Sequence, residues 1–162
     1  MKAKAMEPTS DLKRVFRTTV IINGALVACL FLYALMVELV KSQLRPFTGL
    51  DSGLRFQTLR FLFFGAAVGA VVFVRLAGRT LPKMMPGENL HQMISRLSRT
   101  AVITSALGEL PAMLGFVQFL LTGFSRDFYI LLFVSLFLEF MYFPRLQVWQ
   151  DLARKRFPQQ GI

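Results

Sequence analysis

Four blocks of apolar residues dominate the pattern of hydrophobic and polar positions along the chain. They run from Val15 to Val40, from Phe61 to about Leu81, from Ala101 to Leu121, and from Phe128 to Phe143. A helix needs about 20 mainly apolar residues to cross the hydrocarbon core of a bilayer. We therefore predict an all-α polytopic membrane protein with a single membrane domain over residues 1–162. The predicted transmembrane helices cover about residues 15–40, 58–81, 99–122 and 127–144.

A fifth helix is predicted after Pro144, which ends the fourth block. Beyond it, Leu146, Trp149 and Leu152 recur among basic residues. This spacing predicts a basic interfacial helix at about 145–157, with Trp149 as its membrane anchor. The alternative is a solvated basic tail.

The first and third blocks open on similar sequences, Arg17-Thr-Thr-Val-Ile21 and Arg99-Thr-Ala-Val-Ile103. The second and fourth blocks also share residues at one constant offset. We therefore expect two helical hairpins in parallel orientation, a kind of internal repeat that occurs in transport proteins. The repeat reflects either a duplication or a coincidence among apolar segments with basic ends.

Composition agrees with lipid as the solvent, because 54% of the residues are hydrophobic and only 17% are charged, against about a quarter charged in soluble domains. The net charge of +10 has a topological explanation, since 14 of the 19 Lys and Arg residues fall on one side of the predicted helices. The positive-inside rule places that side, with both termini, in the cytoplasm. We expect a bacterial cytoplasmic (inner) membrane, with anionic lipid and no nucleic acid as the partner of the basic residues.

Glu109 is the only ionisable residue between Thr100 and Gly123, in the third block. A carboxylate at the centre of a bilayer costs about 2.5–3.5 kcal/mol on insertion scales, so it is expected to be paired, protonated or functional. Pro111 follows it and leaves nearby backbone carbonyls without a donor. We take Glu109, Ser105 and Pro111 as an ion-binding candidate.

Small residues on the same helix predict close helix packing. Gly108, Ala112 and Gly115 form a stripe beside Glu109, and the second block offers a matching pair, Gly65 and Gly69, in a GxxxG spacing. Small residues let two helices approach closely in lipid, where packing drives association. Glu109 is therefore expected to face another helix.

The fourth block contains a second acidic residue, Glu139, on a polar line with Ser135 and Tyr142. Arg75, on the second block, is expected at the same depth in the membrane. We predict a structural Glu139–Arg75 ion pair.

The sequence offers little for catalysis or metal binding. One Cys and one His cannot form a protein-only metal site, and no nucleotide-binding loop, nucleophile elbow or metal-ligand cluster is present. We therefore predict no catalytic residues, no metal, no cofactor and no enzymatic activity.

Around residues 99–121 the string RTAVITSALGELPAMLGFVQFLL resembles the ion-carrying helix of rotary ATPase proteolipids, the c-type ring subunits. Glu109, Pro111 and the following apolar run stand where that family has its carboxylate, proline and apolar run. The resemblance implies proton or cation binding at Glu109. In that family the carboxylate helix ends its hairpin, whereas here it begins one. Otherwise the chain resembles small four-helix membrane proteins with no assigned activity.

Two main functional hypotheses follow. In the first, the protein is a small membrane subunit of a larger or oligomeric complex, and Glu109 binds or relays a proton or cation. In the second, it is a non-catalytic structural or assembly protein in which Glu109 is only packed, protonated or paired. Both expect a homo-oligomer or other membrane subunits as partners.

Overall fold

The computed structural model describes residues 8–44, 47, 49, 56–80 and 89–156 of the 162-residue chain, and every regular element among them is an α-helix. The five helices are α1 (Pro8–Gln43), α2 (Phe56–Thr80), α3 (Leu90–Thr122), α4 (Ser125–Tyr142) and α5 (Leu146–Arg156). The all-α prediction is confirmed. Residues 81 and 157, the predicted ends of the second and last helices, lie outside the described residues.

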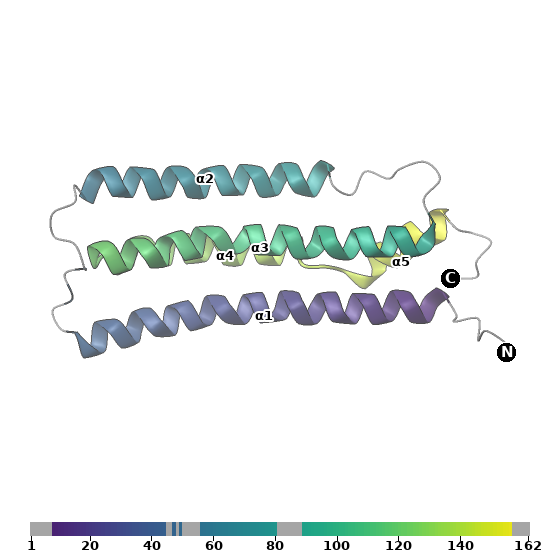
Figure 1. Ribbon diagram of the computed structural model, residues 1–162, viewed down its shortest axis with the longest axis horizontal. Coiled ribbons are helices and arrows are strands. Elements are labelled where there is room, and N and C mark those ends of the chain that lie inside the picture. Colours follow the sequence, from purple (N-terminus) through teal and green to yellow (C-terminus); the bar gives the residue numbers. More distant parts are fainter. Residues whose placement is uncertain (1–7, 45–46, 48, 50–55, 81–88, 157–162) are drawn as a thin grey trace.

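Helix α3 is the centre of the bundle (Figure 1). It contacts α1, α2 and α4, and α1 and α2 lie on opposite sides of it. Helices α1 and α3 run in the same direction, while α4 returns antiparallel beside α3. We call the end of the bundle with α5 the α5 end, and the end with the α3–α4 turn the turn end.

This arrangement corrects the prediction of two helical hairpins, although the two helix pairs do run in the predicted parallel orientation. Helices α3 and α4 form a close hairpin, but α3 separates α1 from α2 (Figure 1). Helices α1 and α3, which open on similar sequences, both start at the α5 end, but the two helix pairs do not pack alike.

Local sequence explains where α3 begins and ends. The Gln92 side chain accepts a hydrogen bond from the backbone N–H of Asn89, which satisfies a donor at the helix start. At the other end Gly123 adopts a left-handed conformation with φ 75°, and its N–H bonds to the Phe119 carbonyl. Glycine tolerates this backbone angle without a steric penalty, which allows the chain to turn directly into α4.

Four segments are long and apolar enough to cross a membrane: Leu12–Gln43, Gln57–Leu76, Leu90–Thr122 and Ser125–Lys155, the last including α5. Burial follows the pattern expected of a protein in lipid. Large side chains such as Phe61, Phe133 and Phe140 point outward, whereas polar side chains are buried. Soluble proteins rarely bury acidic residues. The buried polar and charged residues are Thr19, Asn23, Thr104, Ser105, Glu109, Gln118, Asp127, Ser135 and Glu139.

Two apolar clusters lie toward the two ends of the bundle. At the turn end, Leu30 of α1 packs with Ala112 and Phe119 of α3 and with Phe128 of α4. The other cluster, at the α5 end, joins α1, α3 and α5, and it consists of Leu12, Leu90, Met93, Ile94, Trp149 and Ala153. Most of the buried polar side chains of α3 lie between these clusters.

Trp149 is therefore not a membrane anchor, and its helix is not a solvated tail. Its side chain is buried, and its ring meets Phe16 of α1 edge-on, with 5.4 Å between the ring centroids. Sequence spacing identified the apolar face of α5, but it did not show that α1 and α3 extend far enough to cover that face. At about 1.5 Å per residue, the 33 residues of α3 exceed the thickness of the hydrocarbon core.

Candidate functional site

The contact between α3 and α4 is made possible by the predicted small-residue stripe. A Cβ atom added to Gly115 would lie 3.0 Å from the Leu131 Cβ and 3.3 Å from the Phe128 Cα, so the two backbones approach closely at this point. A Cβ on Gly108 would meet a Glu139 carboxyl oxygen at 3.3 Å. Ala112 between them is fully buried. The stripe therefore packs on α4, whereas its predicted match was the glycine pair of the second block.

The predicted contact of the stripe with the glycine pair of α2 is wrong within this chain. Gly65 and Gly69 are exposed on α2, and a Cβ added to either would have no atom within 4 Å. The GxxxG spacing places both glycines on one helix face, but it carries no information about which face turns toward α3.

Pro111 lies inside α3, and the helix continues through it. Proline normally disturbs the backbone hydrogen bonds around it. Here the N–H of the next residue, Ala112, donates to the Ser135 hydroxyl of α4 at 2.9 Å. The bond between helices gives this buried backbone group a partner and fixes the register of α4 beside Glu109.

Glu139 faces α3 in the buried middle of the bundle and is only 1% exposed. The Ser105 hydroxyl donates a hydrogen bond of 2.8 Å to its Oε2 atom. Its Oε1 atom lies over Gly108 and is buried without a hydrogen-bond partner among the described residues. Ser105 was predicted as part of an ion-binding candidate with Glu109 and Pro111, and its hydroxyl is bonded to Glu139.

Glu109 lies beside this group and is 6% exposed. The Tyr33 hydroxyl of α1 lies next to this carboxyl group. Its Oε1 atom is also buried without a hydrogen-bond partner among the described residues. Glu109 and Glu139 are close enough to interact electrostatically. The site is therefore a buried carboxyl pair joining three helices.

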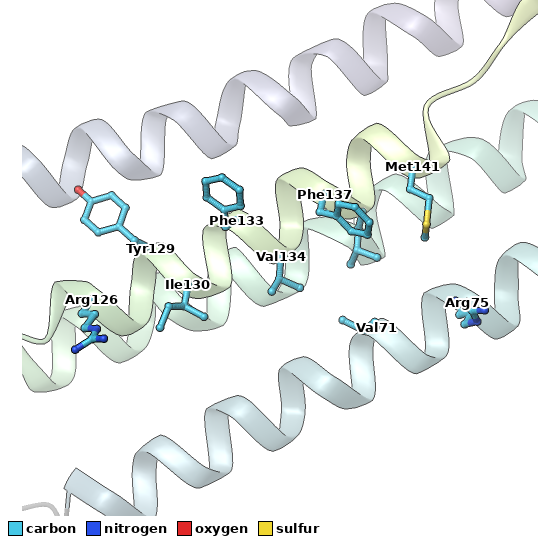
Figure 2. A pocket seen from close by; sticks show the side chains of 10 residues that line it. Val71, Arg75, Arg126, Tyr129, Ile130, Phe133, Val134, Phe137 and Met141 are labelled. Carbon is cyan, nitrogen blue, oxygen red and sulfur yellow. The ribbon is translucent and has the colours of Figure 1, made fainter.

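The predicted Glu139–Arg75 ion pair is not formed. Figure 2 shows Arg75 on α2, beside a groove that also receives Ile130, Val134 and Met141 of α4. Glu139 projects from the other side of α4, toward Ser105. The two residues lie near the same end of the bundle, but they occupy different faces of their helices.

A second buried polar group lies at the turn end, and sequence reasoning missed it. Asp127, at the start of α4, is paired with Arg60 of α2, with Nε–Oδ2 and Nη2–Oδ1 distances of 3.0 Å each. The Gln118 amide of α3 donates to the same carboxylate at 3.0 Å. A fork-shaped contact of this kind is among the stronger hydrogen-bonded ion pairs. Both charged residues stand at the starts of their predicted helices, 58–81 and 127–144, where their sequence context gave no reason to pair them.

Glu38 behaves as an interfacial charge near the same end. Its carboxylate contacts Lys41 at 2.9 Å and accepts a hydrogen bond from the Tyr129 hydroxyl of α4. These two ion pairs are thus at the turn end, and neither involves Glu109 or Glu139.

Glu109 and Glu139 have no cationic partner among the described residues, and this limits the chemistry available to the carboxyl pair. Two ionised carboxylates at close range repel one another, and burial adds a desolvation cost to each charge. A proton or a small cation bound at these carboxyl groups relieves both costs. Within the described residues there is no group of three or more His, Cys, Asp or Glu side chains able to hold a metal ion.

Tyr33 is the other member of the site that sequence reasoning missed. It stands in the long apolar run of α1, and a hydroxyl at that depth was the available signal. Asn23, one of the fully buried residues of α1, gave a similar signal, because an amide in an apolar helix must find a partner.

No protein-family model matches this chain, and neither a curated protein nor a solved structure shows significant similarity to it.

Proposed function

We propose that this protein is a small integral membrane subunit in which Glu109 and Glu139 together bind a proton or a small cation. The observation that supports the proposal best is the pair of buried Oε1 atoms, one from each carboxyl group, that have no hydrogen-bond partner among the described residues. Ionisable residues inside a membrane segment are costly, and they are usually associated with ion or proton movement.

The carboxyl pair differs in one respect from what the resemblance to rotary ATPase proteolipids implies, because it contains a second carboxyl group. Glu109 remains the carboxylate beside a helix proline, and Glu139 becomes its partner on the antiparallel helix. The four helices are compatible with both termini in the cytoplasm of a bacterial inner membrane, where the basic α5 end would meet anionic lipid. Exposed Gly65 and Gly69 would serve contacts with a second copy or with another membrane subunit.

Carbodiimide labelling tests the proposal, because these reagents react with protonated carboxyl groups in apolar surroundings. Purified protein in detergent would be labelled at several pH values, with and without sodium ions, and the modified residue identified by mass spectrometry. We expect labelling at Glu109 or Glu139, slowed by raised pH or by the bound cation. Glu38→Gln is the matched control, since Glu38 is exposed and already paired with Lys41.

Ion flux in proteoliposomes separates transport from a purely structural role. Glu109→Gln and Glu139→Gln should each abolish the flux while leaving the helical content unchanged. If neither carboxyl group is labelled and flux is the same in all variants, the carboxyl pair is a packing feature, and the structural or assembly hypothesis replaces the proposal.

A further inference from the structure

The α5 end of the bundle contains a cavity whose lining comes within one helical turn of Glu139. It has a volume of about 400 Å³ and opens between α3, the end of α4 and the start of α5. Its lining includes the polar side chains of Thr100, Thr104, Tyr142 and Arg145. A space of this size with several hydrogen-bonding groups can hold water.

The inner part of this α5-end cavity lies about one helical turn from Glu139. On α3, the lining residue Ala101 stands four positions before Ser105, the residue that donates a hydrogen bond to Glu139. On α4, the lining residue Tyr142 stands three positions after Glu139 and on the same helix face. These spacings correspond to about 6 Å and about 4.5 Å along a helix.

A buried amide, that of Asn23 in α1, lies on the α5-end side of the carboxyl pair and gives an independent observation. It is fully buried, and both polar atoms of its amide have no hydrogen-bond partner among the described residues. It follows Thr19 by one turn of α1, and the Thr19 hydroxyl bonds to Ser98 of the parallel helix α3 at 2.7 Å. This register puts Asn23 beside residue 102 of α3, between Ser98 and Ser105. An unpartnered buried amide at this level is a site for water or for a passing ion.

The turn end is closed in a different way. There the Asp127 carboxylate is already neutralised by Arg60 and bonded to Gln118. Phe119 and Phe128 are fully buried beneath this ion pair. A polar cavity thus lies on the α5-end side of the carboxyl pair, and packed aromatic rings lie on its turn-end side. Water and ions can therefore approach the pair from the α5 end and not from the turn end.

We propose that the α5-end cavity is a water-filled vestibule through which protons or small monovalent cations reach Glu139 and Glu109 from one side of the membrane only. The inference rests on the proposed function for the identity of the cargo, while the existence and sidedness of the vestibule can be measured separately. Glu139 is the first carboxyl group reached from the vestibule, and Glu109 is the deeper one.

Thiol accessibility tests this proposal in the full-length protein. All variants would carry Cys29→Ala, which removes the natural thiol. The reporter would be Thr104→Cys, at a cavity-wall residue that is 4% exposed. The matched control is Ile103→Cys, one residue away at the same depth, which is 45% exposed on the outward face. Vesicles of known orientation would be treated with a membrane-impermeant thiosulfonate from either side, with Val148→Cys and Thr122→Cys marking the α5 end and the turn end.

We expect Thr104→Cys to react at least tenfold faster when the reagent is applied from the α5 end, and Ile103→Cys to stay unlabelled from both sides. Thr100→Cys, nearer the cavity mouth, provides a second reporter if Thr104→Cys does not fold. Labelling of the correctly folded Thr104→Cys and Thr100→Cys reporters from the turn end, from both sides equally or not at all would overturn the proposal.

The same measurement in a Glu109→Gln/Glu139→Gln background separates this inference from the proposed function. The labelling should persist there, because the cavity wall does not include either carboxyl group. A protein that labels as expected but neither reacts with carbodiimide nor conducts ions has the vestibule and lacks the proposed function.

Discussion

Replacing Gly115 with alanine should weaken the contact between α3 and α4. The new Cβ would lie 3.0 Å from the Leu131 Cβ and 3.3 Å from the Phe128 Cα, whereas carbon atoms pack best at about 3.5–4.0 Å. Both neighbours belong to rigid parts of α4, so the helices must separate. Overpacking of this kind costs about 1–3 kcal/mol.

Gly65→Ala is the matched control for this prediction. Gly65 also lies inside a helix, but nothing lies within 4 Å of its added Cβ. Both substitutions share the gain of about 1 kcal/mol that alanine has over glycine in a helix. The difference between the two variants therefore isolates the packing term, and Gly115→Ala should be less stable than Gly65→Ala by about 1–3 kcal/mol.

The assay is equilibrium unfolding in mixed micelles, with increasing SDS as denaturant and helix content followed by circular dichroism. The free energies of unfolding of wild type, Gly115→Ala and Gly65→Ala are compared at one micelle composition. Equal values for the two variants would refute the close α3–α4 approach on which the position of Glu139 depends.

Three further changes test other parts of the structure. Asp127→Asn should lower the free energy of unfolding by about 1.5–3 kcal/mol, because it weakens charge-assisted bonds to Arg60 and Gln118, whereas the exposed Arg126→Gln should change it by less than about 0.5 kcal/mol. The fluorescence of Trp149, the only tryptophan, should be shielded from acrylamide in detergent, and strong quenching would instead place the ring at the surface. Trp149→Ala should lower the free energy of unfolding by about 3–5 kcal/mol. Ser135→Ala should cost about 1–3 kcal/mol in SDS unfolding, because the Ala112 N–H loses its acceptor, and an unchanged value would show that this bond contributes nothing.

Much of the fold could be predicted because lipid-crossing helices have a strong signature. The lengths of the apolar blocks identified α1 to α4, the predicted end at residue 122 is the observed end of α3, and Pro144 indicated where α4 ends. The side-by-side order of the helices could not be predicted in the same way. Outward and inward faces in lipid are both largely apolar, so periodicity did not show that α3 lies between α1 and α2.

The candidate site was predicted in part for a related reason. The cost of burying charge identified Glu109, and helix periodicity placed Ser135 and Glu139 on one line. Which partner meets Glu139 depends on the rotation of α2 and α4 about their axes. That rotation turns Arg75 toward a groove and Glu139 toward Ser105, and neither outcome is encoded by residue spacing alone.

Infrared spectroscopy of the carboxyl groups tests the shared proton most directly. Difference spectra across a pH titration would be recorded for wild type, Glu109→Gln, Glu139→Gln and the double variant, following the C=O stretching band of protonated carboxyl groups. If the two residues form one site, the wild-type band disappears in the double variant, and each single variant shifts the titration of the carboxyl group that remains. Single-variant spectra that add up to the wild-type spectrum, or a band that survives in the double variant, would contradict a shared site.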